Sequence, residues 1–333
     1  MTCRAASNRG AIRIRPQASM GTFPSLTLSD GLRVHGRPQI GQLGEGMVNV
    51  EEEESPMPGG TDPVLGSYGE SLTIEVPVPV TEDTELSADH AFVRLMRACG
   101  CSVSIATGTA TINALLGGCV GFDATDVVPI GVEWAQRGGL THRWVDAIGA
   151  VESFHADGGG VVLARVVLHA RVVSKVDTTA FPAVTYPGQA KMLAARNATL
   201  EAASESLPGL YSWELQTGIT AQEQEDQLAA AGLAPPFVYQ SDVALFNIDG
   251  PQAPDYSEGA WAKFLTMADT ADLELRIKGQ TANDVLEIDS PRFYTSPQTM
   301  GDNAGHRTDA RELTLKPSGT TPAWTIRLNE QPA

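Results

Sequence analysis

The sequence VVLARVVLHARVV at residues 161–173 is the strongest strand signal in the chain. Its second, fourth and later even positions form one unbroken apolar face, whose members are Val162, Ala164, Val166, Leu168, Ala170 and Val172. The other face mixes Arg165, His169 and Arg171 with valine and leucine. Strict alternation predicts a β-strand, and this one is about twice the usual strand length. We expect one face in the core and a second face that lines water or meets another subunit.

Turn signals before this stretch predict further antiparallel strands. Apolar residues alternate over 130–135, Arg-Gly-Gly at 137–139 favours a tight turn, and apolar residues return over 140–148. A glycine-rich turn at 157–160 then opens the long strand. Similar patterning predicts regular structure at 72–80, 238–248, 273–277, 284–288, 312–315 and 324–328. Pro77 and Pro79 cannot donate to a sheet, so the strand at 72–80 should end at an edge or leave its sheet.

Helical patterns are few. Ser87 is placed to cap a helix over residues 88–99, and Gly100 suits a left-handed stop after it. The apolar stripe of this helix consists of Phe92, Leu95, Met96 and Cys99. A second helix is expected at 258–268, and the alanine-rich stretch 189–205 could also be helical. Any helix at 220–232 would be mostly exposed.

These elements predict a mainly β fold, a β-sandwich or partly open barrel of antiparallel strands with one or two flanking α-helices. Residues 1–60 are interpreted as an extended N-terminal arm that ends in an acidic loop. Residues 61–333 would form the β domain, and 177–235 a connecting or inserted segment within it.

Charge is unevenly distributed along the 333 residues. The chain has 40 acidic and 23 basic residues, a formal charge of −17. Residues 1–40 hold six arginines against one aspartate, so the remainder carries 17 basic and 39 acidic residues. Such a body repels DNA, so specific nucleic-acid binding is disfavoured except through the basic residues 1–40. Opposite charges in the first 54 residues make Arg13, Arg15, Glu51, Glu52, Glu53 and Glu54 candidates for contacts between subunits.

The cysteines and the N-terminus favour an intracellular, soluble protein. Cys99 and Cys101 are one residue apart, too close for an ordinary disulfide or a C-x-x-C site, and we expect them to be reduced packing residues. The first 16 residues lack the apolar core of a signal peptide, and no stretch has the roughly 18 apolar residues of a membrane span.

Catalytic motifs are missing from the sequence. No phosphate-binding G-x-x-x-x-G-K-[ST], no G-x-S-x-G elbow, no H-E-x-x-H and no calcium loop occurs. His142, His155 and His169 fall on neighbouring predicted strands and would be metal ligands only if brought together; structural roles are favoured. Glu75 with Glu133, or Asp284 with Glu287, could be drawn as a glycosidase pair. We expect no enzyme activity, no cofactor and no metal.

Several segments together resemble the tail tube (major tail) proteins of tailed bacteriophages. The segments are HAFVRLMRACGC at 90–101, VPIGVEWAQRGGLTHRWVDAIGAVESFHADGGG at 128–160 and VVLARVVLHARVVSKVDTTAFPAVTYP at 161–187. Weaker echoes occur in AIRIRPQASMGTFP near the N-terminus and PAWTIRLNE near the C-terminus. The run GLTHRWVDAIGAV at 139–151 and the alanine-rich stretch 189–205 depart from the family pattern. The likeness rests on the order and spacing of elements, because none of these segments is a catalytic fingerprint.

The resemblance implies a structural virion protein assembled in the bacterial cytoplasm. Members form hexameric rings that stack around a tape-measure protein, meet tail terminator and tail-tip proteins, and let phage DNA pass without binding it specifically. No membrane partner is implied. In such a ring the second face of the long strand, with Arg165, His169 and Arg171, would line the lumen or a neighbour.

Two alternatives remain open from the residues. The chain could be another virion tail or neck protein, such as a terminator, completion or decoration protein. It could also be a β-sandwich carbohydrate-active hydrolase or binding module, although aromatic residues make up only 6% of the chain, which disfavours sugar stacking.

Overall fold

The computed structural model describes most of the chain between residues 10 and 328, and all structural statements below concern that part. The described ranges are 10–19, 21–43, 47–51, 61–65, 69–80, 86–106, 109–114, 127–136, 139–157, 160–177, 181–186, 191–192, 198–202, 205–206, 210–222, 238–241, 243–251, 272–278, 285–295, 299–303 and 306–328.

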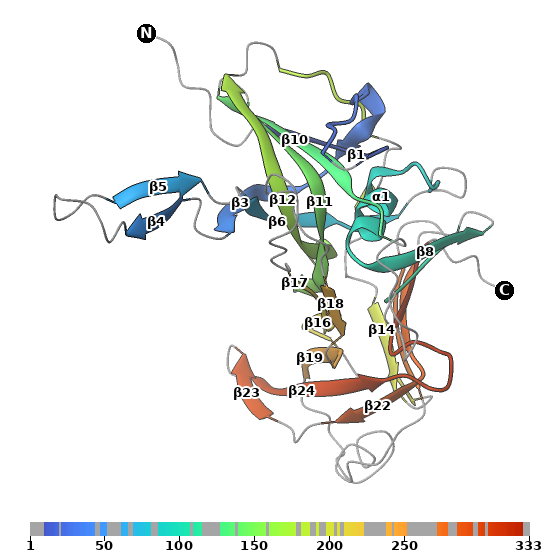
Figure 1. Ribbon diagram of the computed structural model, residues 1–333. Helices are drawn as coiled ribbons and strands as arrows, with labels where there is room; N and C mark the ends of the chain where they lie inside the picture. Colours follow the sequence, from blue (N-terminus) through green and yellow to red (C-terminus); the bar gives the residue numbers. More distant parts are fainter. Residues whose placement is uncertain are drawn as a thin grey trace.

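Antiparallel β-sheet dominates the described residues, as the sequence predicts. The centre of the largest, 12-stranded sheet is the pair of long strands β11 (Leu140–Asp157) and β12 (Leu163–Asp177). On one side β12 pairs with β6 (Gly69–Pro77), which pairs in turn with β3 (His35–Leu43). Figure 1 shows β11 and β12 running together from the top of the molecule to its middle.

On the edge of β11 that faces away from β12, two separate groups of strands pair with β11, one after the other along its length. Its first half pairs with β10 (Ile130–Gln136), followed by β1 (Gly10–Pro16) and β2 (Gly31–Leu32). Its last residues pair with β16 (Ser212–Gln216). The sheet continues from there through β19 (Leu245–Pro251) and β24 (His306–Lys316) to β22 (Arg292–Thr295) and β23 (Thr299–Asn303). One long strand thus joins two sheet regions, which explains its 18 residues.

A second sheet of seven strands combines three strands from the C-terminal third with four from residues 101–206. Its order is β15 (Glu205–Ser206), β14 (Ala198–Ala202), β20 (Leu273–Lys278), β21 (Val285–Ser290), β25 (Thr325–Leu328), β9 (Thr109–Ala114) and β8 (Cys101–Ala106). Three two-stranded sheets complete the described strands: β7 (Pro79–Val80) with β13 (Lys191–Met192), β17 (Ile219–Gln222) with β18 (Val238–Ser241), and β4 (Met47–Glu51) with β5 (Thr61–Leu65).

The α-helix of the described residues, α1 (Ala91–Ala98), covers one face of the first sheet region. It contacts β1, β10 and β11, and buries Phe92, Leu95 and Met96. The expected cap is wrong: His90, not Ser87, is the N-cap, and its Nδ1 accepts from the Phe92 N–H at 3.2 Å. Gly100 has φ +70°, which confirms the left-handed stop. A 3-10 turn, Leu28–Asp30, precedes β2. No described helix is long and apolar enough to cross a bilayer.

The strand predicted at 161–173 is confirmed to have one buried face and one partly exposed face. Its predicted core face is buried from Val162 to Ala170, while Arg165 and Val173 on the other face are exposed. The strand at 72–80 is confirmed to leave its sheet at the prolines, because Pro79 and Val80 form β7 and pair with β13. Strands β20, β21, β24 and β25 include or overlap the four expected C-terminal strands.

Other expectations are corrected. Residues 10–43 are not an arm, because β1 is paired on both sides and Ile12 and Ile14 are buried. The alanine-rich stretch 189–205 contributes strands where it is described, and 220–222 belongs to β17 instead of a helix. The segment 238–248 is interrupted between β18 and β19. The expected helix at 258–268 lies outside the described residues.

Candidate functional site

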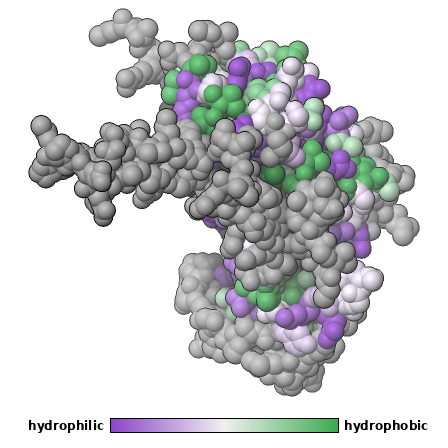
Figure 2. All heavy atoms as spheres, viewed as in Figure 1, coloured by the Kyte–Doolittle hydropathy of each residue, from purple (hydrophilic) through white to green (hydrophobic). Residues whose placement is uncertain are grey.

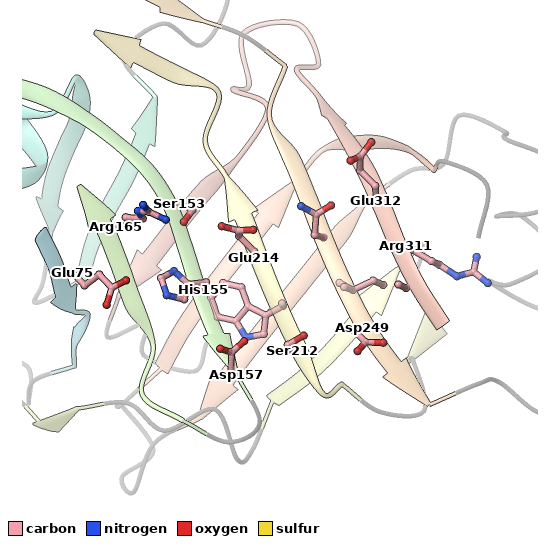
Figure 3. Close-up of a pocket in the computed structure, with 14 residues that line it drawn as sticks. Glu75, Ser153, His155, Asp157, Arg165, Ser212, Glu214, Asp249, Arg311 and Glu312 are labelled. Atoms are coloured by element: carbon pink, nitrogen blue, oxygen red, sulfur yellow. The ribbon is translucent and has the colours of Figure 1, made fainter. Parts of the chain in front are cut away.

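A polar groove of about 590 Å³ lies on one face of the large sheet where β6, β12, β11, β16, β19 and β24 run side by side. The register of the antiparallel strands determines which side chains form the bottom of the groove, because residues directly opposite each other on neighbouring strands point to the same face of the sheet. The lining residues are Glu75, Ser153, His155, Asp157, Arg165, Ser212, Trp213, Glu214, Asn247, Ile248, Asp249, Ala310, Arg311 and Glu312. Figure 3 shows the labelled side chains spread over adjacent strands.

Three rows of paired residues cross the groove. The first row pairs Glu75 with Arg165 and Arg165 with Ser153. A second row runs across four strands in the order His155, Glu214, Asn247 and Glu312. A third contains Asp157, Ser212 and Asp249. The lining therefore contains five carboxylates and two arginines, and the groove is a net negative surface rich in hydrogen-bond acceptors.

Ion pairing and packing restrict what the groove can bind. Arg165 Nε lies 3.1 Å from Glu152 Oε2, so part of its charge is balanced. In Figure 3 the Arg311 side chain extends away from the other labelled side chains. Trp213 is 3% exposed, and its indole stacks with Phe246 at a centroid distance of 6.1 Å. The one aromatic residue of the lining is thus occupied in packing and offers little surface for sugar stacking.

Two of the predicted inter-subunit arginines are held within the chain. Arg13 Nε donates to Glu133 Oε1 at 3.0 Å, and Arg143 Nε donates to Glu133 Oε2 at 2.9 Å. Glu133 is nearly fully buried, and its two arginine partners offset the cost of burying a charged carboxylate. Arg15 donates to the Ser25 carbonyl at 2.8 Å and lies 3.6 Å from Asp30 Oδ2.

Asp30 connects the N-terminal strands to helix α1. Arg94 Nη1 of the helix donates to Asp30 Oδ1 at 2.7 Å, and the Thr27 N–H donates to Oδ2 at 2.6 Å. Burial opposes ionisation, but the hydrogen bonds from Thr27 and Arg94 and the charge of Arg15 outweigh it and lower the pKa of Asp30. The carboxylate is therefore a structural anchor, and Arg15 is partly occupied by it.

Arg171 is held by a buried carboxylate at a bulge in β11. Its Nη2 lies 3.3 Å from Oδ2 of Asp146, which is fully buried and has φ +55°. The Gly21 N–H donates to Asp146 Oδ1 at 2.7 Å, and the Asp146 N–H donates to Gln17 Oε1 at 2.7 Å. Such a backbone conformation is costly for a non-glycine residue, and these bonds stabilise it.

The three histidines singled out in the sequence occupy different environments. His142 stacks between Trp134 and Trp144 with centroid distances of 5.3 Å to each ring, and His155 lies in the groove. Burial lowers the pKa of His169, and burial followed by the charge of Lys175 lowers that of His142. No group of three potential metal ligands occurs among the described residues, so the metal hypothesis gains no support.

Of the two carboxylate pairs drawn from the sequence, Glu75 and Glu133 do not come together, and the pair of Asp284 with Glu287 lies partly outside the described residues. Glu75 on β6 and Glu133 on β10 are separated by β12 and β11, which places their strands about 14 Å apart at the usual strand spacing. Glu287 is ion-paired to Arg327, and Asp284 lies outside the described residues, as do Glu52, Glu53 and Glu54. Glu51 ends β4.

The two described cysteines are confirmed as free and buried. Burial raises the pKa of Cys101 to about 12, and burial together with the neighbouring Cys101 raises that of Cys99 well above its usual value. Thiols held neutral in this way are poor nucleophiles and act as packing residues.

Sequence reasoning missed most of the groove. Glu214, Asn247 and Asp249 sit at alternate positions of β16 and β19, so period-two patterning could have placed them on one face. Their meeting with Glu75 and Arg165 depends on pairing between segments more than 40 residues apart, which local patterns do not specify.

No protein-family model matches the chain, and no curated protein sequence matches it.

Proposed function

We propose that this protein is a structural virion protein that assembles into stacked hexameric rings, forming the tail tube through which a tailed bacteriophage delivers its genome. Its partners would be copies of itself, the tape-measure protein, and the terminator and tail-tip proteins. DNA would pass along the lumen without being bound specifically. The mature location would be the virion tail.

The observation that carries this proposal is the length and two-faced character of the β11–β12 pair. An 18-residue strand spans about 60 Å at 3.3 Å per residue, roughly three times the usual strand. One face of the pair is core, and the other presents a polar, mostly acidic groove. A long sheet with a wet acidic face suits a wall of a conduit for DNA, because carboxylates repel phosphates.

The test is negative-stain electron microscopy of the purified chain combined with its mass in solution. Stacked rings or tubes with a central hole support the proposal. Closed rings that never stack favour a terminator or completion protein instead. A persistent monomer that binds glycans favours the carbohydrate-binding alternative and counts against the tube.

A matched variant separates these outcomes further. Glu214→Gln with Glu312→Gln removes two groove carboxylates while keeping their shape. Tube formation should survive this change, because the Glu312 side chain is exposed, the Glu214 side chain is only half-buried, and glutamine keeps the size of each. A glycan-binding or hydrolytic groove would lose its activity in the same variant.

A further inference from the structure

Glu70 is a buried carboxylic acid near the start of β6. It is 5% exposed and lies opposite Ala170 of β12, in the row that continues through the core residues Leu72 and Ile74. Burial of an ionised carboxylate is costly unless other groups compensate its charge. The partners of Glu70 therefore decide which chemical form its carboxyl group takes.

Two side chains of the long strand pair contact this carboxyl group, one at each oxygen. Nε1 of the fully buried Trp144 on β11 donates to Oε2 at 2.8 Å, and Nζ of Lys175 on β12 donates to Oε1. Lys175 lies beyond Arg171, where the pairing of β12 with β6 ends among the described residues. The lysine side chain thus extends back along its strand to reach Glu70.

The ion pair of Glu70 and Lys175 lies at the boundary between the core and solvent. The side chain of Lys175 is 33% exposed, whereas that of Glu70 is almost completely buried. Strand β12 ends in the upper part of the molecule, where Figure 2 shows hydrophilic and apolar residues side by side. A water molecule released at Glu70 can therefore leave past the lysine.

His142 is a buried base beside this ion pair. It is the cross-strand partner of Lys175 and stacks between Trp134 and Trp144. Its Nδ1 is buried and has no hydrogen-bond partner among the described residues. Buried polar atoms without a partner are rare, and proton transfer is one reason to retain them. Because burial and the charge of Lys175 lower the pKa of His142, the ring is neutral at pH 7 and can accept a proton.

The glutamate and the lysine have two possible chemical forms, an ion pair or an amide with one released water. Bulk water favours the ions because it hydrates both charges, but the buried carboxylate has lost this hydration. An amide carries no net charge, and its carbonyl oxygen keeps the hydrogen bond from Trp144. Well-oriented groups in contact also react with effective concentrations of about 10⁵–10⁸ M. The site therefore favours condensation.

We propose that Glu70 and Lys175 form a self-modification site, at which an isopeptide bond joins the Glu70 carboxyl carbon Cδ to Lys175 Nζ after the chain has folded. The reaction needs no oxidant, reductant or second substrate, because it only removes water. This inference does not rest on the proposed function, since the bond forms within one chain.

The atoms balance in a short sequence of steps. Lys175 first gives one proton to Glu70 Oε1, which yields a neutral amine and a carboxylic acid. The lone pair of Nζ then forms the bond to Cδ, while the Trp144 N–H stabilises the negative charge that develops on Oε2. His142 accepts a second proton from Nζ and returns it to Oε1, which leaves as water when the Cδ–Oε1 bond breaks. The amide nitrogen keeps the third proton of the ammonium.

The bond ties β6 to the end of β12 at positions that are 105 residues apart in sequence. A cross-link between distant positions restricts the unfolded chain and thereby stabilises the fold, as a disulfide does. The two strands then cannot separate at this end without breaking a covalent bond.

Intact-mass spectrometry of the purified, denatured chain tests the proposal. The mass should be lower than that of the sequence by about 18 Da, the mass of one water. After trypsin digestion, the peptide that contains Glu70 should be joined to the peptides on either side of Lys175, because an acylated lysine is not cleaved. Tandem spectra place the bond at these two residues.

Lys175→Arg is the decisive variant, because arginine keeps the positive partner of Glu70 but does not form the amide. Its mass should match its sequence. Lys316→Arg is the matched control, a partly buried lysine on β24, and should lose water like the wild-type chain. Circular dichroism melts verify that both variants fold.

His142→Phe tests the proton transfer separately, because the phenyl ring keeps the stack between the two tryptophans. The cross-linked form should accumulate about a hundredfold more slowly in this variant, and an equal rate would overturn the role of His142. The bond itself is overturned if the folded wild-type chain keeps the mass of its sequence after prolonged incubation. It is equally overturned if Lys175→Arg still loses water, because the loss then arises elsewhere in the chain.

Discussion

At Gly149 the neighbouring strand β12 leaves no room for a side chain on β11. Gly149 is paired with Leu168, next to the bulge that follows Val145, and a Cβ at this position would lie 1.9 Å from the Val167 carbonyl oxygen. Backbone atoms cannot rotate away as a side chain can. The central strand pair therefore depends on the absence of a side chain here.

Gly149→Ala should lower the free energy of unfolding by about 2 kcal/mol or more, because the strands must separate or shift register. Urea denaturation measures the loss. Gly41→Ala is the control, since its nearest contact would be the Ser71 hydroxyl at 2.5 Å, the end of a side chain that can turn away. Equal losses in the two variants would contradict this account.

The buried histidines make stability depend on pH. The pKa values of His142 and His169 are lowered in the folded protein, so the unfolded chain binds more protons below about pH 6.5. Stability is then complete above that pH and is lost as the pH falls, by at most about 1.4 kcal/mol per pH unit for each histidine. Urea denaturation between pH 5 and pH 8 measures the slope.

His142→Phe isolates one histidine, because the phenyl ring can stack between Trp134 and Trp144 without titrating. The slope below about pH 6.5 should become shallower in this variant. At about pH 8 the imidazoles of His142 and His169 are neutral, so the difference in stability between the wild-type chain and the variant at this pH reflects only how well histidine and phenylalanine pack at position 142. An unchanged slope would assign the pH dependence to other groups.

At the level of single residues, sequence could predict burial but not partners. The alternation at 161–173 identified the core face, and the same logic identified Gly100 as a stop. Charge patterning predicts that Arg13 contacts another subunit, and it gives no sign of the hydrogen bond that Arg13 donates to Glu133 in the same chain. These two residues are 120 positions apart, and nothing local to either one indicates that β1 and β10 pair.

Among the elements, β1 shows how strongly pairing can override composition. Its neighbourhood is rich in arginine, glycine and proline, which favoured an arm. Yet Ile14 is fully buried within the core cluster, and β1 pairs with β10 along its whole length. The local signal for this strand is the apolar side chain at every second position, Ile12 and Ile14.

Ile14→Ala should therefore cost about 2–5 kcal/mol of unfolding free energy, as expected for a buried isoleucine that leaves a cavity. Thermal or urea denaturation measures it. Ala18→Ser, at an exposed position two residues beyond the strand, is the control and should change stability little. A negligible effect of Ile14→Ala would restore the interpretation of this stretch as an arm.

The alanine-rich stretch illustrates the opposite error. Alanine favours helix, but Leu200 is buried and β14 pairs with β20 from Ala198 to Ala202. Helix propensity amounts to less than about 1 kcal/mol per residue and yields to a cross-strand partner that buries a leucine. Strands with strong alternation, such as β12 and β25, needed no such information and were correctly placed.

For the whole molecule, the distribution of charge matters more than its total. The groove lining has five carboxylates against two arginines, a balance of −3. The net charge of −17 would weaken DNA binding anywhere on the surface, but only charges beside the groove can act on DNA that lies along it. If the groove lines a conduit for DNA, as we propose, this local repulsion keeps the passing DNA from binding.

Glu214→Lys with Glu312→Lys should convert the groove from a surface that DNA avoids into one that binds it. Each replacement changes the local charge by +2, so the lining moves from −3 to +1. We expect the wild-type chain not to retard duplex DNA in a gel at about 50 mM salt, and the variant to retard it and release it near 200 mM. The control is Glu201→Lys with Glu274→Lys, a pair opposite each other on β14 and β20, which makes the same total change away from the groove. Retardation by both variants would mean that total charge governs DNA avoidance, and retardation by the wild-type chain would contradict the role of the groove as a repelling wall.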